Sequence, residues 1–123
     1  MKMFVYGSLM SGMRANEEMD GAELVCPEAV TVDPLSMYIN DGYPFVFNGR
    51  SKCRIKGELY EVPDSLLKRL TDYEGEFYYM TVTDVICAER TVCAYIFMGR
   101  GHHCDMAEVA DGDYRKFYNA ENQ

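Results

Sequence analysis

The sequence contains no tryptophan, only two histidines and no apolar run approaching the roughly 18 residues of a membrane-spanning helix. Basic residues are also scarce: 12 lysines and arginines stand against 20 aspartates and glutamates, and the net charge is −8. Without a basic stripe to neutralise phosphates, we expect no nucleic-acid partner, and the same deficit disfavours binding to an anionic membrane. The negative charge favours solubility and does not by itself indicate a cationic substrate.

Cysteine pairs with metal-binding or redox spacing are absent. The five cysteines are spread along the chain without a C-x-x-C pair, and the N-terminus has no apolar segment followed by a small-residue cleavage site. We therefore expect free thiols and a cytoplasmic location, where the compartment is reducing. Cys87 and Cys93 lie in β-like runs and are expected to be small core residues.

The two histidines are neighbours, in the segment 102–105 (HHCD). Adjacent side chains on a strand point to opposite faces, and no second cluster completes a tetrahedral ligand set. A polar loop is therefore expected here. We expect neither a metal nor another cofactor.

What is present is a β-rich chain of ordinary domain size. With 123 residues, 48% of them hydrophobic, we expect one domain over 1–123 that folds without a disulfide or metal. The longest helix is expected from Pro63 to near Asp72, with shorter helical segments at 16–19 and 113–118. Strands are predicted over 3–6, 24–32, 35–39, 45–47, 53–62, 78–87 and 91–98.

The excess of strands over helices indicates an α+β fold with a small, strongly curved or closed sheet and helices at its ends. Pro27 makes the strand 24–32 an interrupted or an edge strand. Turns are expected at 40–44 (NDGYP), at Asn48-Gly49 and at 88–90. Gly57 indicates a bulge or a close approach of another backbone.

The most informative segment is at the N-terminal end, where an apolar run leads into Gly7-Ser8-Leu9. Glycine adopts backbone angles that other residues resist and lets the backbone approach a ligand closely. Successive backbone N–H groups at such a turn can form an anion-binding concavity. With a separate acid/base carboxylate, this turn would make a minimal site for amide chemistry on an amino acid.

The candidate carboxylate is Glu74, just past the predicted helix. Four aromatic residues lie close to it in the sequence: Tyr73, Phe77, Tyr78 and Tyr79. A carboxylate packed among rings is desolvated and its pKa rises, which suits a group that accepts and returns a proton near neutral pH. Periodicity alone does not choose between Glu74 and Glu76, and an exposed charge is the ordinary alternative for either.

Other polar residues are open to two interpretations. Tyr78 would either donate a hydrogen bond in the pocket or be a packed strand tyrosine. Tyr114, Arg115 and Tyr118 would close over the pocket from the tail, where Arg115 suits a carboxylate ligand. For Arg115, an exposed tail charge is the slightly favoured alternative.

Four segments, in this order, resemble the γ-glutamylcyclotransferase-like (AIG2-like) family: 5–9 (VYGSL), 43–44 (YP), 55–62 (IKGELYEV) and 70–75 (LTDYEG). The resemblance runs from the N-terminus to about residue 98, and more loosely through 113–115. It implies a small mixed β-barrel with a few helices. It also implies the release of 5-oxoproline from γ-glutamyl amino acids or γ-glutamyl amines. By resemblance, the catalytic glutamate is Glu74 and the substrate-binding loop is Tyr6, Gly7, Ser8 and Leu9.

The chemistry that such a substrate requires agrees with these residues. Its own α-amine attacks its γ-carbonyl, so the protein must fold the substrate, move protons with one carboxylate and hold an anion with backbone N–H groups. The sequence departs from many relatives at Met80, where they have an arginine. That departure keeps an alternative function open, a non-catalytic binding module for a small anionic or γ-glutamyl metabolite. The oligomeric state does not follow from the sequence.

Overall fold

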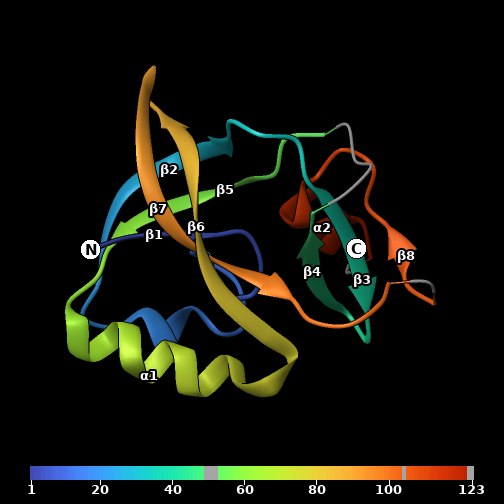
Figure 1. The fold of residues 1–123 in the computed structure, drawn as a ribbon, viewed down its shortest axis with the longest axis horizontal. Coiled ribbons are helices and arrows are strands. Elements are labelled where there is room, and N and C mark those ends of the chain that lie inside the picture. Colours follow the sequence, from blue (N-terminus) through green and yellow to red (C-terminus); the bar gives the residue numbers. More distant parts are fainter. Residues whose placement is uncertain (49–52, 104, 122–123) are drawn as a thin grey trace.

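A computed structural model describes residues 1–48, 53–103 and 105–121, and a closed barrel of five strands forms its centre (Figure 1). The barrel order is β1-β5-β2-β6-β7. Neighbours in this order pair antiparallel, and β7 closes the ring onto β1 by the parallel pair Met3↔Tyr95. The strands are β1 (Lys2–Val5), β2 (Glu23–Thr31), β5 (Lys56–Glu61), β6 (Tyr78–Cys87) and β7 (Arg90–Gly99). The expected closed β-barrel is confirmed.

A second sheet of three strands stands beside the barrel, together with the C-terminal helix (Figure 1). Its order is β4-β3-β8, with β3 (Ser36–Asn40), β4 (Tyr43–Phe47) and β8 (Ala107–Glu108). The β3–β4 hairpin turns at Asp41 and Gly42, whose φ angles of 58° and 82° are both positive, as tight hairpins favour. The predicted turn is confirmed. The two-residue β8 was not expected, because so short a strand carries no alternation.

The β6–β7 hairpin is the longest regular pairing, with Tyr78 opposite Gly99 at one end and Cys87 opposite Arg90 at the other. Strand β2 is interrupted as expected, since its register against β5 shifts around Pro27. The edge alternative is wrong, because β2 also pairs with β6. The expectation of a core position is wrong for Cys93, which is exposed next to the buried Ala94.

Four helical segments complete the described residues: η1 (Asn16–Met19), α1 (Asp64–Glu74), η2 (Gly75–Phe77) and α2 (Tyr114–Glu121). Helix α1 lies across one end of the barrel and buries three leucines against it: Leu66, Leu67 and Leu70 (Figure 1). It runs two residues further than expected, so Glu74 is its last residue. None of the described helices is long and apolar enough to cross a membrane.

Gly57 marks a close contact between β5 and β1. A β-carbon there would lie 2.3 Å from the Val5 carbonyl oxygen and 2.8 Å from the Phe4 ring. The close backbone approach expected at this glycine is therefore present. The expected hairpin at Asn48-Gly49 lies outside the described residues, because position 49 is not among them.

Candidate functional site

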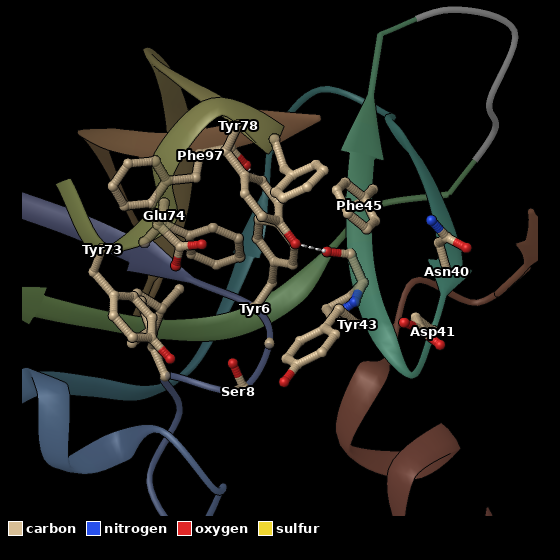
Figure 2. Close-up of a pocket in the computed structure, with 16 residues that line it drawn as sticks. Tyr6, Ser8, Asn40, Asp41, Tyr43, Phe45, Tyr73, Glu74, Tyr78 and Phe97 are labelled. Atoms are coloured by element: carbon tan, nitrogen blue, oxygen red, sulfur yellow. Dashed lines mark hydrogen bonds between the residues drawn. The ribbon is translucent and has the colours of Figure 1, made fainter. Parts of the chain in front are cut away.

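A pocket of about 520 Å³ opens where the end of β1, the β3–β4 hairpin and the α1–β6 junction meet (Figure 2). Half of its sixteen lining residues are aromatic. The described lining holds two carboxylates, Glu74 and Asp41, and no lysine, arginine or histidine. All six site residues proposed from the sequence line this pocket: Tyr6, Gly7, Ser8, Leu9, Glu74 and Tyr78.

The loop after β1 is pressed against the hairpin. A β-carbon on Gly7 would lie 2.6 Å from Pro44 Cγ, inside the distance that real β-carbons keep. Gly7 is not among the residues with positive φ, so it serves close packing and not a left-handed backbone. The backbone of the loop can therefore reach the pocket wall only because position 7 has no side chain.

The carbonyl groups of residues 7–9 are all occupied. They accept hydrogen bonds from the Met10 N–H at 3.0 Å, the Ala15 N–H at 3.0 Å and the Asn16 amide at 2.9 Å, respectively. Among the residues that the structure describes, the N–H groups of residues 7–9 have no acceptor. A trans peptide holds each N–H opposite the preceding carbonyl, so the N–H groups of Ser8 and Leu9 point away from the hydrogen bonds that the carbonyls of Gly7 and Ser8 accept. The loop thus offers unpaired donors to an anion.

Glu74 is a half-buried carboxylate at the end of α1. Burial raises its pKa from 4.5 to about 7. Its carboxylate has no hydrogen-bond partner within the described part of the chain, so no nearby donor offsets the cost of desolvating the charge. Figure 2 shows the carboxylate turned toward the interior of the pocket, on the wall that also carries Tyr73. Glu76 is exposed on η2 and does not line the pocket, so tertiary packing separates the two candidates.

Two tyrosines tie the pocket walls together. The buried Tyr6 hydroxyl donates to the Phe97 carbonyl at 2.5 Å, and the Tyr78 hydroxyl donates to the Pro44 carbonyl at 2.8 Å. The Tyr78 ring also stacks on Phe45, with centroids 4.7 Å apart. Burial, followed by neighbouring charge that includes the carboxylate of Glu74, raises the pKa of both phenols above the usual value of 10.0. Both therefore stay protonated and act as donors to the backbone.

Several residues expected near the site lie elsewhere. Tyr79 faces away from the pocket, because neighbours on a strand alternate, and Arg100 packs over its ring. The expectation of an exposed tail charge at Arg115 is wrong, since this residue is partly buried and pairs with the carboxylate of Glu58 at 3.0 Å. Arg115 does not close over the pocket either. Met80 packs against the core and does not line the pocket.

Other lining residues had no signal in the sequence. Phe45 comes from the middle of β4 and Phe97 from the last part of β7, in different sheets. Asn40 is the last residue of β3, and Asp41 lies in the hairpin turn. Among the described residues, no group of three or more histidines, cysteines or carboxylates could hold a metal ion, and Cys104 lies outside them.

Comparison with known proteins places this chain in a family. Residues 3–116 match a family model described as gamma-glutamyl cyclotransferase, AIG2-like. A Methanocaldococcus jannaschii protein that carries the provisional name gamma-glutamylcyclotransferase is 29% identical over 118 residues, covering 94% of this chain and 96% of that protein.

Solved structures share the fold at lower identity. YkqA from Bacillus subtilis superposes with a TM-score of 0.83 at 20% identity over 98% of this chain, and this chain spans only 42% of it. An uncharacterised Pyrococcus horikoshii protein has a TM-score of 0.74 at 21% identity, covering 98% of this chain and 95% of its own. A mouse AIG2-like protein has a TM-score of 0.74 at 22% identity, covering 85% of this chain and 80% of its own.

Proposed function

Because this chain belongs to the gamma-glutamyl cyclotransferase, AIG2-like family, we propose that it cleaves a small γ-glutamyl amide to 5-oxoproline and a free amine. The substrate is a γ-glutamyl amino acid or a γ-glutamyl amine. One observation supports this most strongly: a carboxylate with a pKa near 7, Glu74, shares a small pocket with the unpaired N–H donors of residues 7–9. We also propose a cytoplasmic location, which suits the free thiols of Cys26, Cys87 and Cys93.

In this proposal the loop holds the substrate's α-carboxylate. Its backbone donors need no charged side chain to bind an anion. A cavity of about 520 Å³ is within the range of small-molecule sites, and aromatic walls with a few polar groups are typical of such sites. Binding in this pocket brings the α-amine and the γ-carbonyl of the substrate into the geometry of a five-membered ring, which lowers the entropic part of the barrier.

Glu74 moves the protons. Its carboxylate takes a proton from the substrate's α-ammonium, and the resulting amine attacks the γ-carbonyl carbon and forms the ring bond. The tetrahedral intermediate then breaks the original amide bond. In total, two protons pass from the attacking nitrogen to the leaving nitrogen, and the proton that Glu74 took first is one of them. The amine therefore leaves as an ammonium ion, and Glu74 ends as a carboxylate. A pKa near 7 allows both directions of transfer at neutral pH.

The test is 5-oxoproline release from a panel of γ-glutamyl amino acids and γ-glutamyl amines, with Glu74→Gln and the matched control Glu76→Gln. Both replacements keep the side-chain shape, and only the first removes a pocket carboxylate. Loss of a general acid/base lowers turnover by roughly 10²–10⁴-fold, so Glu74→Gln should fall by that factor while Glu76→Gln stays at the wild-type rate.

Wild-type turnover in Glu74→Gln would overturn the role of this residue. If no compound yields 5-oxoproline but one of them raises the melting temperature, the protein is a binding module for that γ-glutamyl metabolite. The departure from many relatives at Met80 motivates this alternative.

A further inference from the structure

A second carboxylate, Glu58 on β5, is buried outside the pocket. It is 2% exposed and accepts four hydrogen bonds. Ser11 donates its backbone N–H at 2.7 Å and its hydroxyl at 2.6 Å, and Tyr60 and Arg115 each donate at 3.0 Å. Burial and the charge of Glu58 raise the pKa of Tyr60 to about 12, so its hydroxyl remains a donor.

A buried charge is costly, and an apolar residue of similar size often stabilises a fold at least as well. Glu58 is therefore not explained by stability alone. Its donors are informative: Ser11 lies two residues beyond the pocket loop, and Arg115 lies on α2, near the other end of the chain. The carboxylate joins these two segments to the barrel.

The connection reaches the loop by two routes. Arg115 also donates to the Ser11 carbonyl at 2.7 Å, so the N–H, the hydroxyl and the carbonyl of Ser11 are all held. Asn16 donates to the Leu9 carbonyl at 2.9 Å and to the Tyr60 hydroxyl at 3.3 Å, and that hydroxyl binds Glu58. These bonds fix the orientation of the peptide groups that follow residues 7–9, at the Leu9 carbonyl and at Ser11.

We propose that Glu58 and Arg115 are positioning residues that hold the loop in the orientation in which its N–H groups bind the substrate's α-carboxylate. This inference rests on the proposed function. Helix α2 then controls substrate affinity although none of its residues lines the pocket. Donors that are held in place before binding need no reorganisation when the anion arrives, whereas a loose loop must be ordered by the substrate.

The effect should fall on substrate binding. The α-carboxylate does not change during ring closure, so its contacts are equal in the ground state and in the transition state. Removing such uniform binding raises KM and leaves kcat unchanged. The pH midpoint of the rate, which belongs to Glu74, should also stay at its wild-type value.

The test compares Arg115→Met with Lys116→Met. Both remove one cation from α2, but in the described part of the chain the side chain of Lys116 pairs with the exposed Asp111 and with no other group. With the γ-glutamyl amide that the wild type converts fastest, Arg115→Met should raise KM by about tenfold and change kcat by less than about twofold. Arg115→Lys should recover part of the lost substrate affinity, because lysine restores the positive charge but not the planar guanidinium group with its several N–H donors. Glu58→Gln should also raise KM and leave kcat nearly unchanged.

Amide hydrogen exchange provides a readout that needs no turnover. In Arg115→Met the protected N–H groups of Met10, Ser11 and Ala15 should exchange about tenfold faster than in Lys116→Met, measured well below both melting temperatures. Equal exchange, or an unchanged KM in a folded variant, would overturn the positioning role. A lower kcat at constant KM would overturn it as well. If the wild type releases no 5-oxoproline, the proposed function fails while the exchange result still decides whether Arg115 holds the loop.

Discussion

Gly7 and Pro44 meet so closely that a β-carbon at position 7 would lie 2.6 Å from Pro44 Cγ. The contact presses the loop after β1 against the β3–β4 hairpin, and both residues line the pocket. The absence of one side chain therefore sets the distance between two walls of the site. It also explains a glycine whose backbone angles other residues would tolerate.

Replacing Gly7 with alanine should separate these walls. Overpacking of this kind costs roughly 1–3 kcal/mol, so we expect a lower melting temperature together with a lower kcat/KM. Pro44→Ala removes the atom that the new β-carbon would meet. The double variant should regain part of both losses, and a double-mutant cycle by urea denaturation measures the coupling. If the two changes in the free energy of unfolding simply add in the double variant, the contact with Pro44 is not the cause of the loss in Gly7→Ala.

The pH dependence of turnover should follow the carboxylate of Glu74. Since burial raises its pKa to about 7, kcat/KM should fall as the pH drops through about 7, where the base becomes protonated. The profile of Glu76→Gln should have the same midpoint. A midpoint close to the ordinary value of 4.5 would mean that Glu74 is well solvated or is not the base.

Glu74 should also lower the stability of the protein at alkaline pH. Its folded pKa lies above its unfolded value, so the folded state binds more protons between 4.5 and about 7, and stability falls as the pH rises through that window. At about 1.4 kcal/mol per pKa unit, the shift amounts to about 3 kcal/mol. Glu74→Gln should therefore be more stable than the wild type at pH 8, and should lose most of this advantage near pH 4.

Thermal unfolding of both proteins at the two pH values measures this difference, because the other carboxylates titrate equally in each. Glu76→Gln is the control and should show no such pH-dependent gain. A Glu74→Gln variant with the same stability difference from the wild type at both pH values would contradict the burial of this charge.

The hydrogen bond from the Tyr78 hydroxyl to the Pro44 carbonyl should contribute both to the stability of the protein and to substrate binding in the pocket. Tyr78→Phe keeps the stacking on Phe45 and leaves a carbonyl without its donor, which costs about 1–3 kcal/mol. Tyr79→Phe is the matched control on the next position of β6, outside the pocket. We expect a lower melting temperature and a higher KM for Tyr78→Phe, by calorimetry and steady-state kinetics, and near-wild-type values for Tyr79→Phe. The opposite ranking would show that the bond does not hold the wall.

Much of the local structure could be predicted from the sequence. The Val, Ile, Thr and Tyr content of 78–87 and 91–98 predicted the two strands of the β6–β7 hairpin, and the leucine spacing predicted α1, because both patterns arise within a few residues of chain. The family resemblance, carried by the order of the motifs, pointed to the loop residues and to Glu74, and the structure brings them to one pocket. Strand β8 could not be predicted, since two residues are too few to show the alternation of apolar and polar side chains that marks a strand.

The sequence by itself therefore determined which segments form strands and helices, and which short motifs hold the donors and the carboxylate. Only the tertiary structure decided that Glu74 and not Glu76 lines the pocket, that Phe45 and Phe97 form its walls, and that Arg115 binds Glu58. The reason is physical. Side-chain periodicity is set by the local backbone, whereas burial and pairing depend on which distant segments meet when the barrel closes and the small sheet packs beside it.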